Sequence, residues 1–77
     1  MKDNLKISDK VIILDTETSR RIFSDDAIGH QANIIENGPL GKLLEVFYGK
    51  IYTVEYKYGM QCFPAKEANK CVQKIKE

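Results

Sequence analysis

Apolar and polar residues alternate most clearly in the segment 51–58. Its alternate positions carry the large apolar side chains Tyr52, Val54 and Tyr56. Because successive side chains of a strand point to opposite faces, this pattern predicts a half-buried strand whose Tyr52 and Tyr56 face the core. Gly59 then turns the chain into a second strand over 60–63, which Pro64 ends.

Two strands are predicted earlier in the chain. Residues 11–14 are four aliphatic residues in succession, which is typical of a strand covered on both faces. A second strand is predicted over 31–36, closed by the turn residues 37–39. The alternative for 25–37 is a helix that Ser24 would cap, but its glycine at position 29 would cost such a helix about 1 kcal/mol.

The segments between these strands have weaker patterns. Residues 15–28 alternate poorly and are interpreted as a long loop that contains Phe23. Residues 40–49 are ambiguous, with a short strand over 43–48 as one interpretation. The mostly polar residues 1–8 are expected to be a flexible lead-in.

The apolar period changes after Pro64. The apolar positions Ala65, Ala68, Val72 and Ile75 follow the spacing i, i+3, i+7 and i+10. This spacing predicts a terminal helix of two or three turns that begins after the proline. A 3₁₀ turn followed by a last strand over 71–75 is the alternative, and the sequence leaves both open.

Length limits what the chain can build. Its 77 residues fit one domain with one core, so we assign 1–77 to a single domain. A domain this small has little room for an enclosed active site, which favours a binding module over an enzyme. Charged residues near the N-terminus stand where a signal peptide would be apolar, and no apolar run reaches the ~20 residues of a membrane span. We therefore expect a cytoplasmic protein that does not enter a membrane.

The cysteines and the histidine indicate no metal centre. Cys62, Cys71 and His30 supply three ligands, whereas a structural zinc site needs four. Both cysteines are expected to be reduced thiols. We expect no cofactor, and a small-molecule ligand is not favoured.

The order of strands and turns resembles an SH3-like small β-barrel of the KOW type. The resemblance rests on the strand after Asp9-Lys10, the long loop, the segments 28–36 and 52–56, the Tyr58-Gly59 turn and the segment 63–67. It implies a mainly β fold of about five short antiparallel strands with a short C-terminal helix; the alternative is an α+β fold in which that helix packs on the sheet. It also implies binding rather than chemistry, for example as an inhibitor or adaptor of the kind that phages encode.

Residues 11–18 also resemble the first motif of DnaQ-like 3′–5′ exonucleases. In that motif a strand ends in Asp-x-Glu, here Asp15 and Glu17, whose carboxylates would bind catalytic metal ions. The further acidic residues and the late histidine of that family are missing after residue 40. We therefore predict no catalytic residues.

The candidate binding residues lie on the predicted long loop and at the ends of the strongest strand. Exposed arginine and aromatic side chains often anchor protein interfaces. The candidates for a protein partner are Arg20, Arg21, Phe23, Tyr48 and Tyr58. The runner-up is an RNA- or DNA-binding function through Lys42, Lys50, Lys57 and the tyrosines. The net charge of +1 gives no overall attraction to nucleic acid, although the half after residue 40 is the more basic one.

Overall fold

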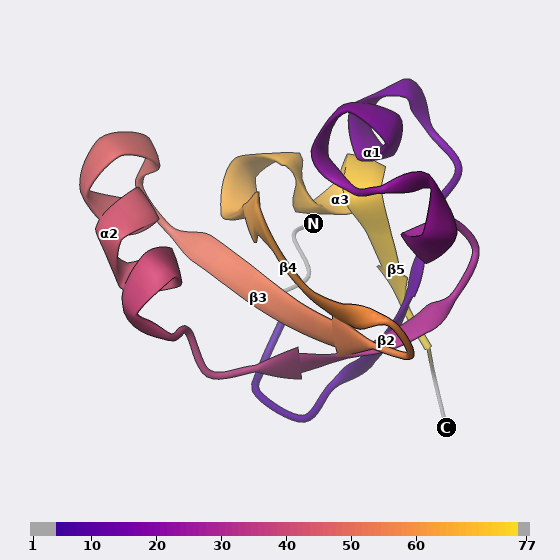
Figure 1. Ribbon diagram of the computed structural model, residues 1–77, viewed down its shortest axis with the longest axis horizontal. Helices are drawn as coiled ribbons and strands as arrows, with labels where there is room; N and C mark the ends of the chain where they lie inside the picture. The colour runs from indigo at the N-terminus through magenta and orange to yellow at the C-terminus, as the bar shows by residue number, and fades with distance from the viewer. Residues whose placement is uncertain (1–4, 76–77) are drawn as a thin grey trace.

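The computed structural model describes residues 5–75 and contains one five-stranded antiparallel sheet. Its strands are β1 (Lys10–Ile13), β2 (Gln31–Ile35), β3 (Ile51–Tyr56), β4 (Gly59–Pro64) and β5 (Val72–Lys74). They lie in the order β4-β3-β2-β1-β5, and the sheet curves around the core (Figure 1). The expectation of a small, mainly β fold of five antiparallel strands is confirmed, and the four strands predicted from the pattern are all present.

The predicted loop over 15–28 is wrong, because this segment contains helix α1 (Glu17–Ile22) and the 3₁₀ turn η1 (Asp25–Ala27). The reason is a polar cap that the apolar pattern does not reveal. The Thr16 hydroxyl accepts a hydrogen bond from the Ser19 backbone N–H at 3.0 Å, so it satisfies a free donor of the first turn. The same hydroxyl donates to the carbonyl of Lys70 at 2.5 Å, which ties α1 to the segment just before β5.

The short strand considered over 43–48 is also wrong, because Pro39–Tyr48 forms helix α2. Proline fits the first turn of a helix, where its missing N–H costs nothing. Gly49 ends the helix with φ 82°, a conformation that glycine adopts without strain, and its N–H bonds to the carbonyl of Glu45. Pro39 at the start and Gly49 at the end therefore favour a helix, despite the strand propensity of the residues between them.

After Pro64 the chain makes two single turns, η2 (Ala65–Glu67) and α3 (Ala68–Cys71), and then enters β5. The short C-terminal helix is confirmed as α3, but it has one turn in place of the two or three predicted, and the last strand of the alternative follows it. Pairing with β1 explains the outcome. Ile13 lies opposite Val72, and the Leu14 N–H bonds to the carbonyl of Cys71 at 2.8 Å. A continuous helix would leave that side of β1 unpaired.

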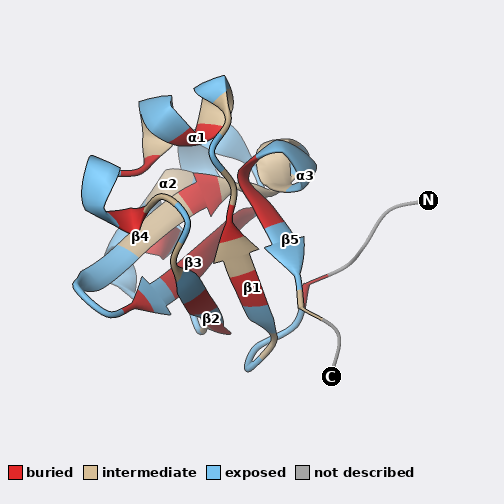
Figure 2. Ribbon diagram, turned by 90° about the vertical axis from the view of Figure 1, so that its right-hand side faces the viewer, coloured by how far each residue is buried: buried red, intermediate tan, exposed pale blue. Residues whose placement is uncertain are grey.

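The core fills the concave side of the sheet, where Figure 2 shows buried residues on β1, β2 and β3. Tyr52 and Tyr56 face inward as predicted. Phe23, expected to be an exposed anchor, is instead 3 % exposed and packs its ring 5.7 Å from that of Phe63. It follows α1 directly, and the helix end turns this side chain into the core.

The predicted lead-in over 1–8 divides into two parts, because residues 1–4 lie outside the described residues. Leu5 is buried in the core, and its N–H lies 3.4 Å from the Tyr52 hydroxyl oxygen. The Ser8 N–H bonds to the carbonyl of Ile34 at 2.8 Å, so the segment before β1 lies against the sheet. Within 5–75, every helix is too short or too polar to cross a lipid bilayer.

Candidate docking surface

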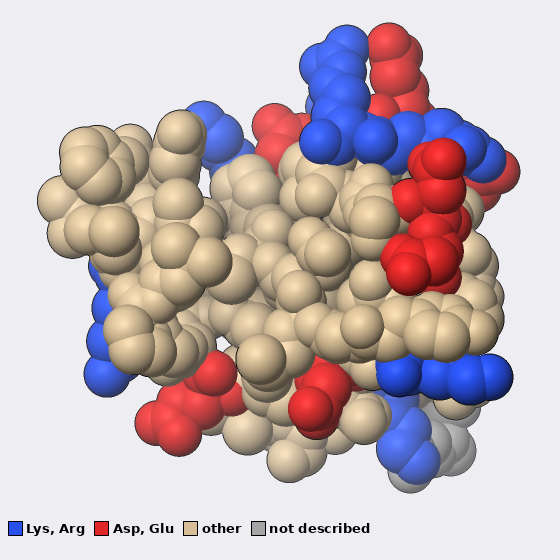
Figure 3. Space-filling view, in the orientation of Figure 1, with Lys and Arg blue, Asp and Glu red and all other residues tan. Residues whose placement is uncertain are grey.

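The largest group of exposed apolar side chains lies on α2. Between 56 % and 77 % of each is exposed to solvent, and the members are Leu40, Leu43, Val46, Phe47 and Tyr48. In Figure 3 this helix forms a projection at the left of the molecule, and the face turned to the viewer is mostly uncharged. Contiguous exposed apolar side chains on a small protein commonly mark a site where another molecule binds.

The spacing along α2 gathers these side chains on its outer side. Leu40, Leu43 and Phe47 follow the spacing i, i+3 and i+7, so they form one row along the helix, and Val46 lies beside it. We call these four residues the α2 stripe. Gly41, on the opposite side, is buried against the preceding segment. The helix therefore turns its smallest residue inward and its largest apolar residues outward, the reverse of an ordinary surface helix.

Asn37 fixes the position of α2 through its side-chain amide. Its Nδ2 donates to the carbonyl of Ile51 at 2.9 Å and to the Glu45 carboxylate at 3.2 Å, while its Oδ1 accepts from the Thr53 hydroxyl at 2.6 Å. One side chain thus joins the start of the helix to its middle and to β3. The α2 stripe is held on a rigid support.

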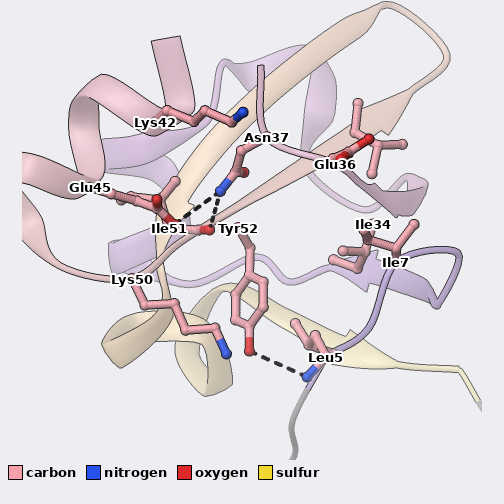
Figure 4. Close-up of a pocket in the computed structure, with 11 residues that line it drawn as sticks. Leu5, Ile7, Ile34, Glu36, Asn37, Lys42, Glu45, Lys50, Ile51 and Tyr52 are labelled. Carbon is pink, nitrogen blue, oxygen red and sulfur yellow. Dashed lines mark hydrogen bonds between the residues drawn. The ribbon is translucent and has the colours of Figure 1, made fainter. Parts of the chain in front are cut away.

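A cleft of about 290 Å³ lies beside the inner side of α2 (Figure 4). Its apolar wall includes Leu5, Ile7, Ile34 and Tyr52, and its charged rim is formed by Glu36, Lys42, Glu45 and Lys50. Two carboxylates and two ammonium groups give the rim no net charge. Such a cleft suits an apolar side chain of a bound molecule better than an ionic ligand.

The arginines predicted to bind a partner lie on α1, away from α2 in Figure 1, and both form ion pairs within their own segment. Arg20 Nε is 2.6 Å from Asp15 Oδ1, and Arg21 is 3.1 Å from Glu17 Oε2. The hydrogen bond from Arg20 lowers the pKa of Asp15 below its ordinary value. Asp15 and Glu17 thus pair with arginines, and residues 5–75 contain no group of three or more side chains that could hold a metal ion.

The two tyrosine candidates, Tyr48 and Tyr58, are exposed as predicted, but they do not form one surface. Tyr48 ends α2 before β3 begins, whereas Tyr58 follows the end of β3. A six-residue strand separates them by about 20 Å. Tyr58 instead contacts His30, with ring centroids 5.7 Å apart.

The lysines proposed to contact nucleic acid are also dispersed. Lys42 lies on α2, and Lys50 Nζ is 5.1 Å from the centre of the Tyr52 ring at the other side of the cleft. Lys57 Nζ is 5.4 Å from the Tyr58 ring at the far end of β3. They make no continuous basic track.

Four residues of the surface, Leu40, Leu43, Val46 and Phe47, were missed by the sequence interpretation. The signal that could have found them is Pro39 as a helix start combined with the i, i+3, i+7 row and Gly49 as a helix end. Comparison of the chain with protein-family models, with curated proteins and with solved structures finds no match.

Proposed function

We propose that this domain is a non-enzymatic protein-binding module that docks the α2 stripe into an apolar groove of another protein. The observation that carries the proposal is the orientation of α2, whose large apolar side chains face solvent while Gly41 faces the fold. An amphipathic helix inserted in a groove is a common mode of recognition, with anchors at the spacing seen here.

The energetics favour such a partner. Complete burial of a Leu, Val or Phe side chain contributes roughly 1.5–3 kcal/mol, so a few anchors are enough for a specific complex. Binding would order little of this chain, because the Asn37 hydrogen bonds already hold α2 against β3. The neighbouring cleft offers room for one apolar side chain at the edge of the interface.

A nucleic-acid partner is the weaker proposal. It needs positive charge along the contact surface, whereas the α2 stripe carries none and Lys42, Lys50 and Lys57 do not form a track. The resemblance to SH3-like barrels stays a prediction from the sequence. An inhibitor or adaptor is the form of module that this resemblance favours.

The experiment uses affinity capture followed by measurement of binding to the purified captured protein. The test variant is Leu43→Glu with Phe47→Glu, and the matched control is Arg21→Glu with Tyr58→Glu, which alters two exposed side chains elsewhere. We expect the test variant to bind at least tenfold more weakly and the control to bind as the unmodified chain does. Far-ultraviolet circular dichroism should be unchanged in both variants and melting should change little, since none of the four side chains is buried and the Arg21–Glu17 ion pair is exposed.

Two further conditions separate the classes of partner. Binding through an apolar surface should survive nuclease treatment and change little as salt is raised, whereas binding to nucleic acid weakens steeply with salt. Normal binding by the Leu43→Glu, Phe47→Glu variant, or loss of capture after nuclease treatment, would contradict the proposal.

A further inference from the structure

Strand β4 forms one edge of the sheet, with β3 as its neighbour on a single side. The hairpin closes at the Tyr56–Gly59 pair, and the Ala65 N–H bonds to the carbonyl of Lys50 at 2.9 Å. Antiparallel pairs alternate between hydrogen-bonded and non-hydrogen-bonded, so these two positions fix the alternation along β4. The backbone groups of Met60 and Cys62 therefore point away from β3.

These outward backbone groups are available for pairing. Among residues 5–75, no hydrogen bond from another segment reaches the backbone of Met60 or Cys62. The Gly59–Pro64 strand also has no charged side chain, although charges are a common protection of exposed edges. The opposite edge, β5, has only three residues and includes Lys74.

We propose that β4 pairs with β4 of a second copy of this chain, antiparallel about a twofold axis at Cys62. In this register the Cys62 N–H of each copy donates to the Cys62 carbonyl of the other. The Met60 N–H of each copy donates to the Pro64 carbonyl of the other, which makes four hydrogen bonds in all. Proline needs only to accept here, so its missing N–H does not hinder the pairing.

The occupant is a second copy because the same edge supplies both halves of the contact. A twofold contact requires self-complementary surfaces, and this edge has donors and acceptors in the correct alternation with no like charges opposed. Met60, 61 % exposed, lies across from Pro64 of the other copy and adds an apolar cross-strand pair. Since the contact uses the sheet edge and not α2, it is independent of the proposed function.

The register makes a measurable prediction about Cys62. Residues opposed in a hydrogen-bonded antiparallel pair have Cα atoms about 5.5 Å apart, which is within the range of a disulfide. Cys62 is partly exposed, whereas Cys71 is buried and inaccessible. Mild oxidation with copper phenanthroline should therefore link two chains through Cys62.

The test combines sedimentation equilibrium under reductant with cross-linking under oxidant. We expect a dimer whose fraction rises with protein concentration, and a disulfide-linked dimer that the Cys62→Ser variant cannot form although it still sediments as a dimer. Met60→Lys should abolish both signals without a change in melting temperature, since the side chain is exposed. Gln73→Lys on the opposite edge and Leu43→Glu on α2 should leave both unchanged.

The inference would be overturned by a chain that remains monomeric up to about 1 mM, where even weak association is visible. It would equally be overturned by a dimer that survives Met60→Lys, that never cross-links through Cys62, or that Leu43→Glu dissociates. The last result would place the contact on the α2 stripe.

Discussion

The Thr53 hydroxyl donates a hydrogen bond of 2.6 Å to the side-chain carbonyl of Asn37, between β3 and the start of α2. Thr53 is buried although it lies on the face of β3 opposite Tyr52 and Val54. The contact shows that α2 and its connection cover this face of the sheet. This hydrogen bond joins the sheet to the segment that leads into the proposed docking helix α2.

Removing that hydroxyl should weaken the fold. We expect Thr53→Val to lower the free energy of unfolding by about 1 kcal/mol, because Asn37 Oδ1 loses its partner at a partly buried position. Urea denaturation measures the loss. Thr18→Val on α1 is the matched control, since its hydroxyl has no hydrogen bond among the described residues, and equal stability of the two variants would contradict the assignment.

Gly41 should resist replacement even by the best helix former. An alanine Cβ at this position would lie 3.0 Å from the Asn37 Cβ, and hydrogen bonds hold Asn37 in place. We expect Gly41→Ala to lower stability, although alanine is ordinarily about 1 kcal/mol better than glycine inside a helix. Thermal melting decides the sign, and an increase in melting temperature would show that Asn37 can move aside.

Truncation of Phe23 should destabilise the fold far more than truncation of Tyr58. Phe23→Ala removes a buried ring that packs against Phe63, so we expect a loss of about 3–5 kcal/mol in the free energy of unfolding. Tyr58→Ala removes a mostly exposed ring and should change stability by less than about 1 kcal/mol. Chemical denaturation of both variants tests the assignment. A loss of less than about 1 kcal/mol for Phe23→Ala would contradict the burial of this ring.

The Cys71 thiol should make stability fall in alkaline solution. Burial raises the pKa of this thiol above its ordinary value of 9.0; the hydrogen bond with Ser19 opposes the shift, and the nearby charge of Glu67 adds to it. The unfolded chain therefore loses the proton first as pH rises, and the folded state loses relative stability from about pH 9 upward. Cys71→Ala should remove this part of the pH dependence, and the same slope in both proteins would attribute it to other groups.

The burial of Cys71 should also make its thiol react more slowly than that of Cys62. Cys62 is partly exposed and should react with a thiol reagent in the folded protein, whereas Cys71 should react only on unfolding. Mass spectrometry of the native and denatured protein distinguishes the two sites.

The strands could be predicted because their information is local. The alternation from Tyr52 to Tyr56 and the aliphatic run after Lys10 each specify a burial pattern within a few residues. Helix α1 and strand β5 could not be predicted in the same way. α1 depends on Thr16 acting as a cap, and β5 depends on pairing with β1, about sixty residues away in the chain.

The candidate site was missed for a different reason. Leu43 and Phe47 lie in a segment whose apolar pattern is ambiguous, with a short strand as one interpretation, and large apolar residues are ordinarily expected in the core. Phe23 is expected at the surface because Arg20 and Arg21 precede it closely in the sequence. Burial of these residues depends on how α1 and α2 pack, which the periodicity of either segment does not specify.

The pairing of the first strand with the last has a consequence for synthesis on the ribosome. β1 is made about sixty residues before its partner β5 and before the Ile75 N–H that bonds to the Lys10 carbonyl. Until the segment after Cys71 emerges, one side of β1 has no strand to pair with. Contacts of such long sequence separation also slow folding. A nascent chain of this protein should therefore stay open to chaperones and proteases until β5 has left the ribosome.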